Sequence, residues 1–297
     1  MNNQADRRFS FLIILPAAVF LTCFVIYPIG LLVTQSFFKI NFLDSSQSVF
    51  VGLDQYFKVF SSVRIFESSL RTLGYTGLAL IAEFSVGFAV ALLLNALSTR
   101  ATVLRTLFLF PLMVPPIVAG LLWRFMLISN FGIVNATLAH WGVISTPNAI
   151  QWLSNPKIVL FSVALADAWV TTSFVTLILY TGLQSLSKEV LEAARIDGAG
   201  SVQMFLKITL PLMLPVIAVV LVLRGMDAAR TFDLVWIMTG GGPSFGSEVL
   251  SLNIYQQMVV YHNVGLASAT AVIFMAALLL FSFFVVFPIW SPLRRRP

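Results

Sequence analysis

Long apolar runs recur along the chain, and each is long enough to cross a lipid bilayer as a helix. A membrane-spanning helix needs about 20 predominantly apolar residues, and only helices and closed barrels satisfy their backbone hydrogen bonds inside lipid. The runs lack the alternating pattern of barrel strands. The pattern predicts an all-α membrane protein with six transmembrane helices, at about residues 11–33, 72–94, 106–127, 158–183, 210–229 and 266–290.

The six runs form one predicted transmembrane domain, residues 11–290, which follows a short N-terminal segment, residues 1–10, and precedes a tail, residues 291–297. The first run is too long and too interrupted by proline for a signal-peptide core, and no small-x-small cleavage site follows it. We therefore expect it to remain as a span.

Composition agrees with a chain embedded in lipid. Hydrophobic residues make up 59% of the 297 residues and charged residues only 10%, whereas a soluble domain carries about 25% charged residues. The single cysteine, Cys23, excludes an internal disulfide and a multi-cysteine metal site. We expect no metal ion and no cofactor bound by this chain itself.

The basic residues set the predicted orientation. The net charge of +6 reflects Lys and Arg gathered in short segments between alternate spans, and such residues collect on the cytoplasmic side of a membrane. The bias predicts that both termini lie in the cytoplasm, and it accounts for the charge without a nucleic-acid partner. The basic residues at the predicted cytoplasmic ends are Arg7, Arg8, Arg100, Arg105, Lys188, Arg195, Lys207, Arg294, Arg295 and Arg296.

The predicted cytoplasmic loop between the fourth and fifth spans, residues 184–210, is long and patterned. Ser187 can cap the N-terminus of a helix, and Glu189 then lies favourably near the positive end of its dipole. Small or aliphatic side chains share one face of this helix at the spacing of one turn. They are Val190, Ala193 and Ala194.

The second half of the loop predicts a turn and another helix. Residues 197–200 form the turn, Ser201 can cap a short helix, and Pro211 ends or kinks that helix where the membrane begins. A helical hairpin with small side chains lets the backbone of another protein approach closely. We expect a protein partner here, and the alternative is an amphipathic hairpin lying on the bilayer.

The same loop resembles a known family. Glu192-Ala193-Ala194, Gly198, Ile208 and Leu210-Pro211 match, at each fixed position and spacing, the EAA loop of binding-protein-dependent ABC importer permeases. The chain also resembles the carbohydrate branch of that family, of the maltose, trehalose and glycerol-3-phosphate type, over about residues 10–290. Its glycine-rich segment, residues 239–243, is typical of the maltose-F-like half of a permease heterodimer. Other similar segments are residues 111–116, 123–124, 131–135, 224–233 and 265–271.

The resemblance implies a type I ABC importer permease in the bacterial inner membrane, which works as one subunit of a larger importer. The implied partners are a second permease, two ATP-binding subunits that hold ATP and Mg²⁺, and an extracytoplasmic solute-binding protein. The chain has no G-x-x-x-x-G-K-[ST] sequence and so no ATP site of its own. The residues implied to couple to the ATPase are Glu192, Ala193, Ala194, Asp197, Gly198, Ile208, Leu210 and Pro211.

Ionisable residues inside the spans predict where the solute passes. Each costs about 2.5–3.5 kcal/mol to insert and is a functional candidate by default. Two polar stripes flank the patterned loop at helical spacing, and in related sugar permeases matching positions line the pathway or touch sugar. Arg224 can instead pair with Asp227 only to make insertion tolerable, and Glu83 fits an inter-helix hydrogen-bond partner. The stripes are Asp167, Thr171 and Phe174, and Arg224, Asp227, Ala228 and Thr231.

Two other classes of protein compete with an importer subunit. An ion-coupled secondary transporter could use Asp167 or Glu83 as a proton site, but it needs no cytoplasmic docking loop, and six spans without an internal repeat fit it poorly. An intramembrane enzyme is disfavoured because the two histidines, His140 and His262, lie far apart in predicted outer segments and no H-E-x-x-H motif occurs.

Overall fold

A computed structural model describes residues 13–97 and 102–293, and the chain divides into two compact units. The first unit comprises residues 1–66 and 253–276, and the second comprises residues 67–252 and 277–297. Several residues behind the orientation argument lie outside the described residues, namely Arg7, Arg8, Arg100, Arg294, Arg295 and Arg296. The same holds for residues 1–10, the first two residues of the first predicted span and most of the tail.

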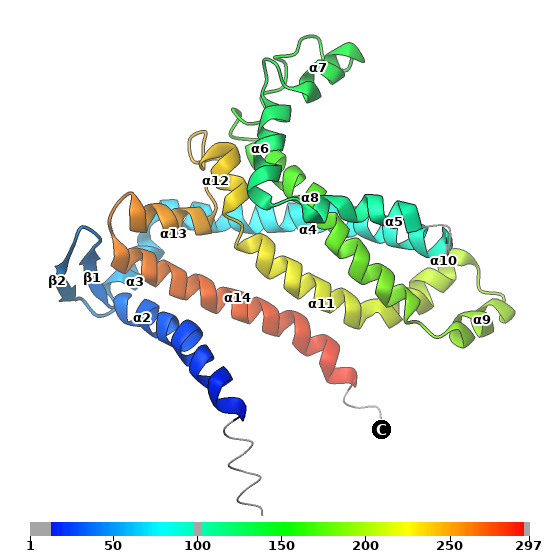
Figure 1. Ribbon diagram of the computed structural model, residues 1–297, viewed down its shortest axis with the longest axis horizontal. Helices are drawn as coiled ribbons and strands as arrows, with labels where there is room; N and C mark the ends of the chain where they lie inside the picture. Colours follow the sequence, from blue (N-terminus) through cyan, green and yellow to red (C-terminus); the bar gives the residue numbers. More distant parts are fainter. Residues whose placement is uncertain (1–12, 98–101, 294–297) are drawn as a thin grey trace, which may run out of the picture. The chain divides into compact units, whose positions relative to one another are not determined.

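The first unit contains the first apolar helix and a small β-hairpin (Figure 1). The helical run Ile13–Gln35 includes a π-helical turn, η1 (Thr22–Ile26), and α2 (Tyr27–Gln35). Strand β1 (Phe38–Asn41) pairs antiparallel with β2 (Asp44–Phe50), with Phe38 opposite Phe50. The sequence pattern did not predict these strands, because β1 alternates apolar and polar residues over only four positions and β2 is mostly polar.

A short helix follows the hairpin. Helix α3 (Asp54–Ser61) buries Gln55 and Val59 on one face. The unit also contains the second half of α13 (Leu250–Val259) and the start of α14 (Val264–Leu293).

The second unit is built on three apolar helices that share one core. They are α4 (Val63–Leu97), α8 (Val159–Gln184) and α11 (Leu210–Ala229). Their buried side chains form one cluster that includes Val90, Leu179 and Met213. Helix α4 starts at Val63, before the predicted span at residue 72. The apolar run could not predict this start, because residues 63–71 include Arg64, Glu67 and Arg71.

Glycine permits the close approach of α4 and α8. A Cβ atom added at Gly87 would lie 2.9 Å from Cγ1 of Val175 on α8, whereas one added at Gly77 on the same helix would meet nothing within 4 Å. Small residues at helix crossings are a common way to bring membrane helices together.

The third predicted span is not one continuous helix. Residues Thr102–Leu109 form α5, Phe110–Met113 form the 3-10 turn η3, and Pro116–Leu127 form α6, with a bend of 99° between the two parts. Pro115 has extended backbone and precedes another proline at the first position of α6. Because proline cannot donate a backbone hydrogen bond and restricts the residue before it, the helix breaks here. In the described part of the chain, five helices are long and apolar enough to cross a membrane, or six with this bent pair.

Short helices follow the bent pair and α11. Helix α7 (Ile133–His140) lies in the predicted outer segment, where Asn135 donates to the backbone oxygens of Pro147 and Ile150 and accepts a 2.7 Å hydrogen bond from Trp152 Nε1. Asn135 and Trp152 thus tie α7 to the segment that follows it. Helix α12 (Asp233–Thr239) ends at Gly240, whose φ of +61° lies in the left-handed region that glycine adopts without strain.

Candidate functional site

A buried guanidinium group joins two helices of the second unit. Arg224 on α11 is 3% exposed, and it contacts Glu83 on α4, which is fully buried. Nε of Arg224 donates to Oε2 of Glu83 at 2.7 Å, and Nη2 donates to Oε1 at 2.6 Å. Such bidentate pairs are the strong form of the arginine–carboxylate interaction, because both bonds are charge-assisted and their geometry is fixed.

Two further carboxylates contact the same guanidinium. Nη2 of Arg224 donates to Oδ2 of Asp167 on α8 at 2.9 Å, and Nη1 donates to Oδ2 of Asp227 at 2.5 Å. The pairing of Arg224 with Asp227 expected from their spacing is therefore present, but it is one contact of three. Asp227 is the most accessible of the three partners, with its side chain 62% exposed.

Hydroxyl groups complete the network. Tyr75 on α4 donates to Oδ2 of Asp167 at 2.9 Å, and Thr171 on α8 donates to Oε1 of Glu83 at 2.8 Å. The sequence stripes did not include Tyr75 or the contact of Glu83 with Arg224. The one available signal was that Glu83 is the only charged residue in its predicted span.

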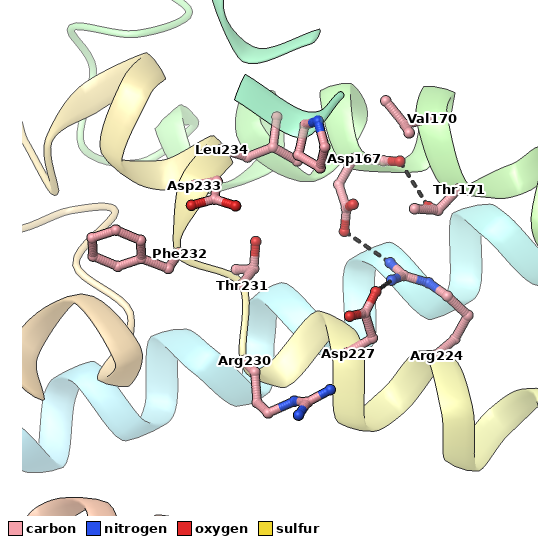
Figure 2. A pocket seen from close by; sticks show the side chains of 11 residues that line it. Asp167, Val170, Thr171, Arg224, Asp227, Arg230, Thr231, Phe232, Asp233 and Leu234 are labelled. Atoms are coloured by element: carbon pink, nitrogen blue, oxygen red, sulfur yellow. Dashed lines mark hydrogen bonds and ion pairs between the residues drawn. The ribbon is translucent and has the colours of Figure 1, made fainter. Parts of the chain in front are cut away.

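A cavity of about 190 Å³ lies beside this network (Figure 2). Of the seven predicted pathway residues, five line it, whereas Phe174 and the buried Ala228 do not. The predicted stripes did not include the residues contributed by α6, by Val170 of α8 and by the segment from Arg230 to Leu234. The lining residues are Asp167, Thr171, Arg224, Asp227 and Thr231, together with Pro116, Val170, Arg230, Phe232, Asp233 and Leu234.

The patterned loop forms a hairpin that begins at the end of α8 and leads into α11 (Figure 1). Ser187 caps α9 (Lys188–Ile196) by accepting from the backbone N–H of Val190, as the sequence predicted. The Ser187 hydroxyl also donates to the Glu189 carboxylate, and this hydrogen bond lowers the pKa of that exposed group. Gly198 has a φ of +81°, which glycine adopts without strain.

The second half of the hairpin differs from the prediction. Helix α10 (Ser201–Met204) has Gly200 at its N-cap and no side-chain cap, so Ser201 does not play that role. The chain then passes through a π-helical turn, η4 (Phe205–Thr209), directly into α11, and Pro211 does not end the helix. The backbone N–H of Leu210 reaches back to Phe205, so the hydrogen-bond register has already shifted before the proline.

The residues of the EAA motif do not share one exposed surface. Ala194 is only 7% exposed, whereas Glu192, Ala193, Asp197, Gly198 and Pro211 are exposed and Ile208 and Leu210 are half-buried. The predicted small-residue face is therefore split, since Ala194 packs inward while Val190 and Ala193 stay outside. Ile196, at 87% exposed, is the most accessible large apolar side chain of α9.

Comparison with known protein families decides the class. The family model described as "Binding-protein-dependent transport system inner membrane component" matches residues 83–296. The chain belongs to this family. The permease thus has the predicted family and inner-membrane location. The match includes the cavity, the hairpin and the buried network apart from Tyr75.

Relatives and solved structures agree with this assignment. The permease is 32% identical over 92% of its length to the sulfoquinovosyl glycerol transport system permease protein SmoG of Agrobacterium fabrum, of which it covers 88%. It is 33% identical over 95% of its length to the trehalose/maltose transport system permease protein MalF of Thermococcus litoralis, of which it covers 93%. A chain of a bacterial ABC transporter involved in import of the acidic polysaccharide alginate has the same fold, with a TM-score of 0.81, 21% identity and 96% of each chain covered.

Proposed function

We propose that the permease imports a sugar or sugar-like solute as half of the translocation pathway of an ATP-driven importer. A second permease supplies the other half, two separate subunits bind ATP and Mg²⁺, and an extracytoplasmic protein delivers the solute. Relatives at about 30% identity over most of the chain are named as sugar permeases, which supports the solute class. A chain of the alginate transporter solved with its periplasmic protein also resembles the permease, with a TM-score of 0.79, which supports a binding-protein partner.

The observation that carries the proposal is the placement of two features on one pair of helices. Helices α8 and α11 border the polar cavity near one end. At the other end they are joined by the hairpin (Figure 1). Asp167 lies 17 residues before Gln184, the last residue of α8, or about 25 Å along a helix. A force applied to the hairpin by an ATPase would reach the cavity through these helices.

The orientation follows from the same proposal. The hairpin must lie in the cytoplasm to meet an ATPase, and the segments around α7 and α12 then lie outside, where a binding protein can reach the cavity. The lysines and arginines at the hairpin support this side, because such residues favour the cytoplasm.

Transport by the reconstituted importer tests the proposal. The permease is co-purified with the products of its neighbouring genes and assayed for uptake of maltose and trehalose and for solute-stimulated ATP hydrolysis. Thr231→Val removes a cavity hydroxyl while keeping its shape, and we expect lower uptake with unchanged assembly and unchanged affinity for the binding protein. Thr181→Val is the matched control, because Thr181 is exposed on α8 and its hydroxyl donates to the backbone oxygen of Ile178.

Two results would contradict the proposal. Equal loss of uptake in both valine variants would show that the cavity hydroxyl is not on the solute path. Uptake that persists without ATP and collapses with a proton ionophore would point to an ion-coupled carrier instead.

A further inference from the structure

The guanidinium of Arg224 is already occupied by the protein's own carboxylates. Four of its hydrogen bonds go to Glu83, Asp167 and Asp227, out of the five that an arginine side chain can donate. Glu83 and Asp167 are buried, so an entering solute that displaced either of them would leave a carboxylate buried without its partner. Arg224 therefore cannot serve as the cation that receives an anionic solute.

The charges around the cavity are negative in sum. Four carboxylates, those of Glu83, Asp167, Asp227 and Asp233, face two guanidinium groups, those of Arg224 and Arg230, which leaves a formal charge of −2. With one buried carboxylate protonated, the sum is still −1. Arg230 is exposed, and its Nε donates to the backbone oxygen of Met226. An anion entering this site meets net electrostatic repulsion, which added salt screens.

An aromatic ring stands at the same cavity. Phe232 lines it and stacks on Trp236, with the ring centroids 6.1 Å apart and the planes at 9°. Its chain neighbours Thr231 and Asp233 also line the cavity and supply a hydroxyl and a carboxylate (Figure 2). The C–H face of a sugar ring suits an aromatic face, and sugar hydroxyls suit these polar groups.

We propose that this cavity admits neutral polyhydroxylated solutes and rejects anionic ones, with Phe232 as the stacking residue in place of Phe174. This inference rests on the proposed function, because it takes the cavity as part of the solute path. Asp227, Thr231 and Asp233 receive the solute hydroxyls, while Glu83 and Asp167 hold Arg224 in place. The named relatives do not decide the charge, because they include a trehalose/maltose permease and a component of an importer for an acidic polysaccharide.

Cysteine-reactive probes of different charge measure the cavity directly, whichever solute is carried. On a Cys23→Ser background, Thr231→Cys and, separately, Thr171→Cys are introduced into the complete importer in detergent. Each is labelled with neutral methyl methanethiosulfonate, cationic trimethylammonioethyl methanethiosulfonate and anionic sulfonatoethyl methanethiosulfonate. Gln203→Cys, on the exposed surface of the hairpin, gives the reference ratio of the two charged reagents.

We expect the ratio of cationic to anionic labelling at the cavity positions to exceed the reference ratio by about tenfold, and to fall when Asp233→Asn is added or the salt concentration is raised. A ratio equal to the reference, or one that favours the anionic reagent, would overturn the inference while leaving the importer function intact. Failure of the neutral reagent to reach either cysteine in any nucleotide state would instead remove the cavity from the solute path, and the proposed function would fail with it.

Discussion

Replacing Arg224 with methionine isolates the contribution of the buried network to stability. Methionine keeps an unbranched side chain but removes the positive charge, so Glu83 and Asp167 remain in the interior without their partner. Breaking a buried ion pair by removing one partner costs about 3–5 kcal/mol, because the remaining charge is left uncompensated. At about 2–4 °C per kcal/mol for a unit of this size, we expect the midpoint of thermal unfolding to fall by about 6–20 °C.

The assay is thermal denaturation of the detergent-solubilised importer, followed by the monodisperse fraction on gel filtration. Arg230→Met is the matched control. Arg230 lines the same cavity, but its side chain is exposed and donates to the backbone oxygen of Met226. We expect that change to stay within about 0.5 kcal/mol. Adding Glu83→Gln to Arg224→Met should restore part of the lost stability, since it removes one of the unpaired charges. Equal effects of the two arginine changes would refute the view that the network is buried and mutually dependent.

Three further predictions concern the backbone and the membrane. Gly198→Ala forces an L-residue into the left-handed backbone region at a cost of about 1–2 kcal/mol, and we expect it to lower solute-stimulated ATPase activity. Gly200→Ala is the control and should leave this activity unchanged, because Gly200 has a φ of −68° and open space around its Cα. Equal activity in the two variants would argue against a structural role for the hairpin turn. Gly87→Ala should destabilise the permease by about 1–3 kcal/mol through overpacking against Val175. Gly77→Ala should be neutral or stabilising in the same thermal assay, because a Cβ atom there meets nothing within 4 Å. A larger loss of stability in Gly77→Ala than in Gly87→Ala would mean that α4 and α8 do not cross at Gly87. A reporter fused after Arg296 should read cytoplasmic and one inserted near Ser244 should read extracytoplasmic, and the reverse result would overturn the proposed orientation.

Local sequence was sufficient for the features that depend on local physics. The apolar runs identified the long helices to within a few residues at α8 and α11, because a span needs only length and hydrophobicity. The cap at Ser187 and the turn at Gly198 were also predictable from the sequence, since each depends on residues a few positions apart. The spacing of the EAA motif identified the family for the same reason.

Tertiary structure alone decided which distant residues meet. The contact between Glu83 and Arg224 joins positions 141 residues apart, and the helical spacing within either span carries no information about it. A periodic pattern places Thr171 and Phe174 on one face of α8. Only packing shows that Thr171 lines the cavity and Phe174 does not, and that Phe232, which directly precedes α12, lines it as well. The burial of Ala194 and the 99° bend before α6 were likewise set by neighbouring elements, because a helical face or a proline break specifies local geometry and not what lies against it.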